Sequence, residues 1–235
     1  MIHSADTLEK DQEFWREQLL GELLLFSMLG RNLYAFPQVD WLDPLADGNL
    51  FDDVPFAADR PETNAGLQLL REWQQEYVAD RPAGLLELRK EHTRLLTGSG
   101  DLPLSPWESV YFSEDRMLFD ERTLEVRRWY RRFGLEPINV RREPDDHIGL
   151  ELSFMAHLAQ LGLEALESGN QTYFEETIAA QRLFAQQHLF AWVPRWCRQM
   201  GEFAHSSFYR GLALVLSGGL NELADLLDLP IVEKQ

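Results

Sequence analysis

The sequence is poor in basic residues and in cysteine, and both shortages exclude classes of protein. It has 22 Lys and Arg against 39 Asp and Glu, which gives a net charge of −17. A chain this acidic repels nucleic acids and anionic lipid surfaces, so neither is an expected partner. Cys197 is the single cysteine, which excludes an internal disulfide framework and a multi-cysteine metal site.

A long hydrophobic run is also lacking. The most apolar stretch, residues 19–29, is interrupted by Gly21 and Glu22, and it is far shorter than the roughly 20 residues that cross a bilayer. The residues before it are acidic, whereas a signal peptide begins with basic residues. We therefore expect a cytoplasmic protein without stable membrane insertion, and the 45% share of hydrophobic residues predicts a packed core.

β-branched residues are scarce as well, and their scarcity predicts helices. Leucine outnumbers valine plus isoleucine by almost three to one, and leucine favours helices whereas β-branched residues favour strands. Apolar residues step by three and four through residues 148–166, as on one face of a helix. The other predicted helices cover residues 6–33, 64–77, 85–96, 120 or 123 to 133, 172–188, 194–204, 207–217 and 219–227.

Three segments interrupt the helical pattern. Residues 36–61 predict a long loop or short irregular helices, and the turn-rich residues 97–108 predict an ordered loop. Residues 136–146 link the N-terminal helices to the helix at 148–166. The sequence predicts an all-α fold, a single helical-bundle domain over residues 1–235. Two sub-lobes remain an alternative, and these would cover residues 1–136 and 146–235 with a hinge near residues 137–145.

The densest polar cluster is E-P-D-D-H at residues 143–147. Proline and acidic residues are typical of a helix start, which is one interpretation. A second interpretation pairs His147 with Asp146 or Glu151 as a general base, a metal half-site or the wall of a recognition pocket. A metal would need a third ligand that no familiar spacing supplies.

A proline-rich loop, L-P-L-S-P-W-E-S-V-Y-F, places Trp107, Tyr111 and Phe112 close together. Such aromatic residues either fill the core or form a stiff groove for an apolar peptide, because a rigid loop loses little entropy on binding. The one basic concentration is Arg127, Arg128, Arg131, Arg132, Arg141 and Arg142. We expect these arginines to pair with the surplus carboxylates.

Signatures of enzymes are weak. Gly98-Ser99-Gly100 lacks the lysine of a phosphate-binding loop, and Ser217-Gly218-Gly219 is more simply a helix C-terminus. No nucleophilic-serine motif is present. The sequence therefore predicts no catalytic residue and no metal site.

Three segments together resemble a known family: PWESVYFSEDRMLF, TLEVRRWYRRFGLEP and EPDDHIGLELSFMAHL. They are similar to the TorD/DmsD family, cytoplasmic chaperones for molybdenum-cofactor oxidoreductases exported by the twin-arginine pathway. The resemblance runs from about residue 85 to about residue 161 and continues more weakly toward the C-terminus. It implies an all-helical protein that is not an enzyme and that binds the leader of a catalytic subunit until cofactor insertion and export.

The resemblance also implies where the leader binds. Pro106, Trp107, Asp146 and His147 are carried over by position, whereas Leu95-Leu96 replaces the leucine and phenylalanine that relatives often have. A twin-arginine leader presents two guanidinium groups and then an apolar segment. Carboxylates expected to meet the arginines are Glu108, Glu143, Asp145, Asp146 and Glu151. Side chains expected to meet the apolar segment are Trp107, Tyr111, Leu95 and Leu96.

The expected partners are the twin-arginine leader and catalytic subunit of a molybdopterin oxidoreductase, with the chaperone a monomer or a domain-swapped dimer. No cofactor is expected, and weak GTP binding is implied by the resemblance alone. One alternative is a delta-type chaperone of a membrane-anchored nitrate reductase. An alternative of another class is a metal- or nucleotide-dependent enzyme centred on Asp146 and His147.

Overall fold

The computed structural model describes residues 5–52, 54–97, 104–113, 121–136 and 144–231. Within these residues the regular structure is helical, which confirms the predicted all-α class. The elements are α1 (Ala5–Tyr34), α2 (Val39–Asp47), α3 (Pro61–Ala79), α4 (Arg81–Leu96), α5 (Ser109–Phe112), α6 (Glu121–Arg132), α7 (Ile148–Glu167), α8 (Gln171–Phe184), the π-helical turn η1 (Ala185–Leu189), α9 (Phe190–Phe203) and α10 (Ser207–Leu226).

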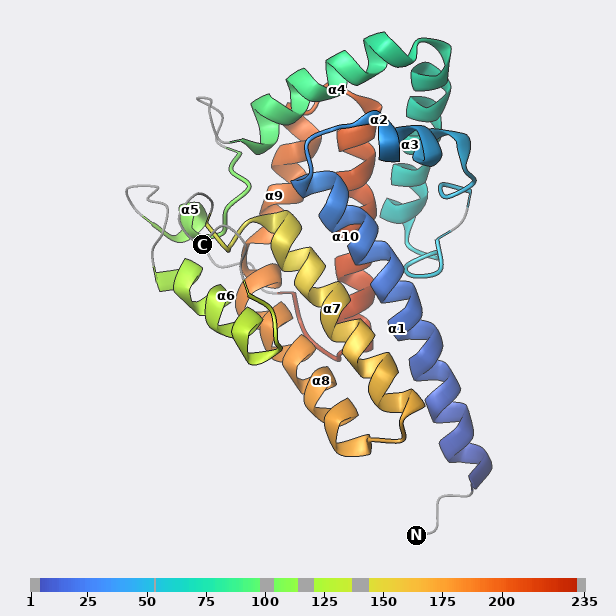
Figure 1. The fold of residues 1–235 in the computed structure, drawn as a ribbon, viewed down its shortest axis with the longest axis vertical. Coiled ribbons are helices and arrows are strands. Elements are labelled where there is room, and N and C mark those ends of the chain that lie inside the picture. Colours follow the sequence, from blue (N-terminus) through green and yellow to red (C-terminus); the bar gives the residue numbers. More distant parts are fainter. Residues whose placement is uncertain (1–4, 53, 98–103, 114–120, 137–143, 232–235) are drawn as a thin grey trace.

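Two long helix pairs form the centre of the bundle, and each joins the N-terminal half of the chain to the C-terminal half. Figure 1 shows α1 beside α7, and α3 packs along α10. Glycines allow the backbones to touch: a Cβ added at Gly30 would lie 2.9 Å from the Gly149 carbonyl oxygen, and one at Gly66 would lie 2.7 Å from that of Gly211. Larger residues at these crossings would force the helices apart.

One large hydrophobic cluster runs through both halves, from Leu25 in α1 to Leu227 after α10. Its largest fully buried side chains include Trp192 and Trp196 of α9. The division into two lobes stays a prediction: residues 137–143 of the expected hinge lie outside the described residues, and Asp145 beside them is buried. In the described part of the chain, no helix combines the length and apolarity that a bilayer crossing needs.

Two predicted helix boundaries are wrong. Pro194 was expected in a first helical turn, but helix continues from α8 through η1 into α9 with Pro194 inside it. Burial of Trp192 and Trp196 on either side compensates for the hydrogen bond that proline cannot donate. Gly218 and Gly219 were expected to end a helix, yet they lie inside α10, where a Cβ at Gly218 would meet Thr63 of α3.

Candidate functional site

The proline-rich loop and the acidic motif form one unit. Trp107 and His147 make an isolated antiparallel bridge, in which the Glu108 N–H donates to the Asp146 carbonyl (3.0 Å) and the Ile148 N–H donates to the Pro106 carbonyl (2.8 Å). Two of the three segments that carry the family resemblance are therefore hydrogen-bonded to each other at the start of α7.

Asp146 is the central acceptor of this unit. Its carboxylate is buried and accepts from the Ser109 N–H at the start of α5 (2.7 Å) and from the Thr123 hydroxyl of α6 (2.8 Å). One side chain thus holds two helices to the segment that begins α7. Hydrogen bonds to an ionised acceptor are stronger than neutral ones, so this contact is a major constraint on the unit.

Two more buried carboxylates pair with cations of this chain. The Glu108 carboxylate lies 2.8 Å from Arg122 Nη1 of α6 and 2.8 Å from His188 Nδ1 of η1. Asp145 pairs with Arg127 of α6, and its carbonyl accepts from the Tyr130 hydroxyl (3.0 Å). Arg122 and Arg127 of α6 therefore pair with Glu108 of the loop and with Asp145 of the acidic motif.

His147 acts as the N-cap of α7. Its Nδ1 accepts from the Gly149 N–H at 3.1 Å, and its ring packs edge-on against Tyr34 (5.2 Å between centroids) and Trp107 (5.9 Å). Burial lowers the pKa of His147 to about 3, against an opposing backbone hydrogen bond to Leu96. A histidine that is neutral and uses Nδ1 as a cap is suited to holding structure, and it is a weak base at neutral pH.

Glu151 was paired with His147 in one sequence interpretation, but the structure directs it elsewhere. Its Oε2 accepts from the Trp192 indole N–H at 3.2 Å, while Oε1 is buried without a hydrogen-bond partner among the described residues. Burial, followed by the charges of Glu108 and Asp146, raises the pKa of Glu151 well above its usual value. Glu151 is therefore the least well compensated carboxylate of the unit.

The predicted apolar contacts divide into buried and accessible groups. Leu95 and Leu96 of α4 are buried in the core, and Pro106 is buried in the loop. Trp107 and Tyr111 are half-buried; the Tyr111 hydroxyl donates to Gln199 Oε1 (2.9 Å). The Trp107 indole N–H has no hydrogen-bond partner within the described residues. Glu143 lies outside the described residues.

Sequence reasoning missed four residues of this unit: Arg122, Thr123, Tyr130 and His188. The expectation that the arginine run pairs with carboxylates is confirmed for Arg127 with Asp145, and more weakly for the exposed pairs of α6. His188 carries no local signal, because its partner Glu108 is 80 residues away in the sequence. In the described part of the chain, no group of three or more His, Cys, Asp and Glu has the geometry to hold a metal ion.

Comparison with known proteins shows the family to which the chain belongs. The family model described as nitrate reductase delta subunit matches residues 58–198, more than half of the chain and the whole of the unit described above. The chain belongs to the TorD/DmsD family. The TorD/DmsD segments quoted from the sequence therefore mark a true family relationship.

Curated relatives in this family are named as chaperones. The chain is 29% identical to the Tat proofreading chaperone DmsD of Salmonella typhi, over 88% of this chain and 91% of that protein. It is 25% identical to the chaperone protein TorD of Vibrio vulnificus (strain YJ016), over 67% of this chain and 69% of that protein. These names assign the chain to a chaperone family and not to an enzyme family.

Proposed function

We propose that this protein is a cytoplasmic maturation chaperone for a molybdenum-cofactor oxidoreductase. It binds the twin-arginine leader of the catalytic subunit and holds it until the cofactor is inserted and the subunit is exported. The observation that carries this proposal is the pair of backbone hydrogen bonds that joins the Trp107 loop to the Asp146–His147 segment. Relatives of this chain are named Tat proofreading chaperones, which supports the same role.

The half-buried loop provides the first contact. Trp107 and Tyr111 are half-buried, and we expect their exposed aromatic surface to contact the apolar segment of the leader. Tryptophan is enriched among residues that dominate binding energy. The loop is fixed by the bridge to His147, so little entropy is lost when a peptide binds to it.

The leader arginines reach the acidic motif in a second step. Glu108 and Asp145 are buried and paired with Arg122 and Arg127, so a guanidinium group from the leader must replace one of the chain's own. This exchange conserves the number of ion pairs and requires α6 to shift. Leader binding is therefore expected to increase amide hydrogen exchange in α6.

A labelled synthetic leader tests the proposal. We expect the purified full chain to bind a twin-arginine leader peptide in fluorescence anisotropy, and to bind a twin-lysine version more weakly because lysine lacks the bidentate geometry. Trp107→Ala should weaken binding about tenfold or more, as truncation of a central aromatic contact does. Trp41→Ala, which removes another half-buried tryptophan outside the site, should leave affinity within about twofold.

His147 separates binding from folding. His147→Asn retains a side chain that caps helices well, so α7 should remain intact, while the ring contact with Trp107 is lost. We expect weaker leader binding and a loss of stability smaller than that of His147→Ala, because Asn keeps the cap but not the ring contacts with Tyr34 and Trp107. If His147→Asn, Trp107→Ala and Asp146→Ala all left leader affinity unchanged, the proposed binding site would be wrong.

A second candidate function follows from the description of the matching family, nitrate reductase delta subunit. In that case the client is a membrane-anchored nitrate reductase. Co-purification from anaerobically grown cells, with identification of the bound catalytic subunit, distinguishes the two clients. A preparation in which no molybdoenzyme subunit is enriched over the control would count against both.

A further inference from the structure

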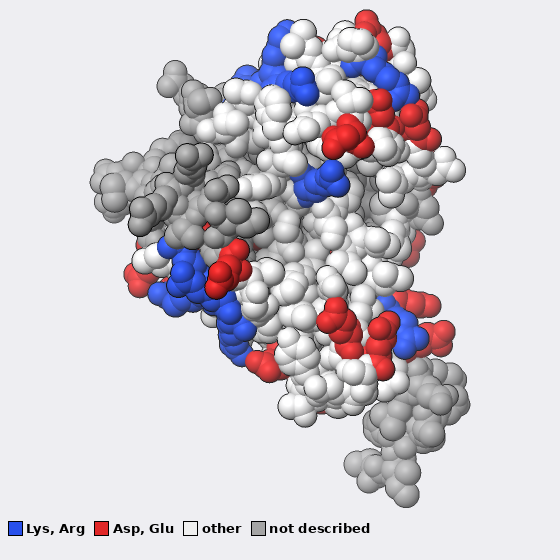
Figure 2. All heavy atoms as spheres, in the orientation of Figure 1, with Lys and Arg blue, Asp and Glu red and all other residues white. Residues whose placement is uncertain are grey.

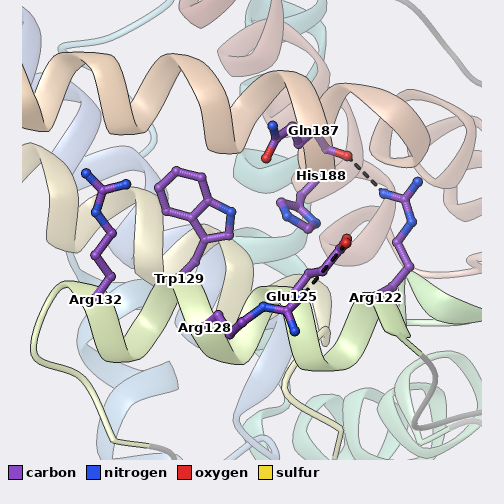
Figure 3. Close-up of a pocket in the computed structure, with 7 residues that line it drawn as sticks. All are labelled: Arg122, Glu125, Arg128, Trp129, Arg132, Gln187 and His188. Carbon is purple, nitrogen blue, oxygen red and sulfur yellow. Dashed lines mark hydrogen bonds and ion pairs between the residues drawn. The ribbon is translucent and has the colours of Figure 1, made fainter.

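The outer side of α6 faces a cavity that borders the leader site through Arg122 and His188, the partners of Glu108. The cavity has a volume of about 550 Å³ and lies between α6 and η1, with Arg122, Arg128, Trp129 and Arg132 on one wall and Gln187 and His188 on the other (Figure 3). Its volume falls in the range of sites that bind ligands. The second wall is a π-helical turn, and such turns occur frequently at functional sites.

The cavity is lined by arginines although the net charge of the chain is −17. Among the described residues, three arginines and one carboxylate, Glu125, line it. The side chains of Arg128 and Arg132 are 64% and 54% exposed, and their carboxylate partners, at 3.8 Å and 3.0 Å, are exposed as well. Figure 2 shows a patch of blue over α6 on this face. Exposed ion pairs are weak, so an incoming anion competes with them readily.

Trp129 forms a fixed apolar platform between the arginines. Its ring stacks on Phe133 (6.3 Å between centroids, 11° between planes) and meets Phe184 edge-on at 6.0 Å. Arg132 lies over the same ring, 5.6 Å from its centroid. The cavity therefore combines cationic groups with a rigid aromatic surface, and arginine and tryptophan are both enriched where binding energy concentrates.

The spacing of the arginines favours an extended chain over a single small anion. Ten residues of helix separate Arg122 from Arg132, which places their backbones about 15 Å apart. An extended peptide covers that length in about four to five residues. The partners that these arginines already have, Glu108, Glu125 and Glu176, are carboxylates.

The walls of the cavity differ from those of a typical phosphate-binding site. Phosphate sites use backbone N–H groups at helix N-termini or in glycine-rich turns. The walls here are the sides of two helices, and the backbone group directed at Arg122 is the Gln187 carbonyl, 3.0 Å from Nη1. The Gln187 carbonyl is an acceptor and supplies no donor for a phosphate, so an anion would meet the guanidinium groups, and the carboxylates that these already bind are the better match.

We propose that this cavity, the α6–η1 cleft, binds an acidic segment of a partner polypeptide. The segment is extended, with Asp or Glu on both sides of one aromatic or large aliphatic residue that covers Trp129. The cleft adjoins the leader site, since Arg122 and His188 line it and also pair with Glu108. The leader is not its expected occupant, because a twin-arginine leader is basic and Arg128 and Arg132 would repel it. The protein thus presents two binding surfaces of opposite charge preference on the two sides of one helix.

Fluorescence anisotropy with a defined probe tests the cleft. The probe is the fluorescein-labelled peptide Glu-Asp-Phe-Glu-Asp-Glu, and its control replaces every Glu by Gln and every Asp by Asn. The double variant Arg128→Gln/Arg132→Gln should raise the dissociation constant of the acidic probe about tenfold or more. The matched control Arg131→Gln/Arg210→Gln removes the same charge from exposed arginines outside the cleft and should change it less than about twofold.

The outcomes decide the proposal. It is supported if wild type binds the acidic probe and not the neutral one, and only the cleft variant loses binding while both variants keep the wild-type melting temperature. It fails if the two double variants weaken binding equally. It also fails if inorganic phosphate displaces the peptide at a concentration close to the dissociation constant of the probe. It also fails if gel filtration shows a wild-type dimer that the cleft variant abolishes, since the occupant would then be a second copy of this chain.

Discussion

Helix α6 has two sides that use the same residue type differently. On the inner side Arg127 pairs with buried Asp145, while Thr123 and Tyr130 donate to the acidic motif. On the outer side Arg128, Arg131 and Arg132 are exposed. The inner arginine cannot be lost without stranding a buried carboxylate, whereas the outer ones contribute little to folding and remain available to bind a partner.

The largest expected effect separates these two sides directly. Arg127→Gln leaves the Asp145 carboxylate buried without its cation, so we expect it to lower the free energy of unfolding by about 3 kcal/mol. Arg131→Gln, on the same helix, should change it by less than about 0.5 kcal/mol. Urea denaturation followed by circular dichroism measures both. Equal losses in the two variants would contradict the distinction between the sides.

Asp146→Asn tests how much the central acceptor contributes. The amide keeps one acceptor oxygen for Thr123 or Ser109 but places its NH₂ group where the other donor points. We expect a loss of about 2 kcal/mol, the scale of hydrogen bonds to a charged group. Asp11→Asn, at an exposed position of α1, is the control and should be nearly neutral. A neutral result for Asp146→Asn would show that the motif is held by packing and not by this carboxylate.

How far the sequence predicts this unit depends on how local each interaction is. Helix α7 and the cap at its start follow from apolar spacing and from residues adjacent in the sequence, and both segments of the bridge were recognised as motifs. His188 and Arg122 could not be found in this way, because each acquires its role from Glu108, which folding brings close. The helix propensity of a residue and its neighbours in the sequence do not predict a contact with a residue this distant in the chain.

The wrong helix boundaries have a similar cause. Pro194 and Gly218 are helix-breaking signals when only neighbours in sequence are considered. In the fold, α9 continues past Pro194, with buried tryptophans on either side of it. At position 218, the close approach of Thr63 requires a residue without a side chain. The sequence also did not predict which arginines are exposed. Arg127 to Arg132 form one basic cluster in the sequence, whereas in the helix Arg127 lies on the inner side and Arg128 and Arg132 lie on the outer side.

A third prediction concerns a buried carboxylate, Glu22, whose hydrogen-bond partner is a neutral amide and not a cation. Glu22 of α1 is buried, and among the described residues its oxygens accept from the Gln181 amide of α8 (3.1 and 3.2 Å). Burial raises the pKa of Glu22 well above its usual 4.5. The folded protein keeps this proton over a range in which the unfolded chain releases it. Stability from this group is therefore present below pH 4.5 and is lost as pH rises toward the raised pKa.

Glu22→Gln should remove that pH dependence. The variant has no ionisation to lose, and its amide can donate to the Gln181 Oε1 atom, which has no partner among the described residues. We expect the variant to match wild type near pH 5 and to be the more stable protein at pH 8, as measured by thermal unfolding across that range. Glu17→Gln, exposed on the same helix, should leave the profile unchanged. Parallel profiles for Glu22→Gln and wild type would contradict the raised pKa.

The smallest expected effect is on the outer side of α6, and it determines whether the cleft is built for binding. Arg128 lies 3.8 Å from Glu125, and the two side chains are 64% and 41% exposed. Solvent and salt screen such a pair, so Arg128→Gln should change the free energy of unfolding by less than about 0.5 kcal/mol. The difference should also shrink between about 0.05 M and 0.5 M salt in urea denaturation, because the screening length falls. A loss as large as that of Arg127→Gln would make Arg128 structural. A negligible loss of unfolding free energy would show that Arg128 faces the cavity without being needed for folding. Its charge is then available to bind a partner.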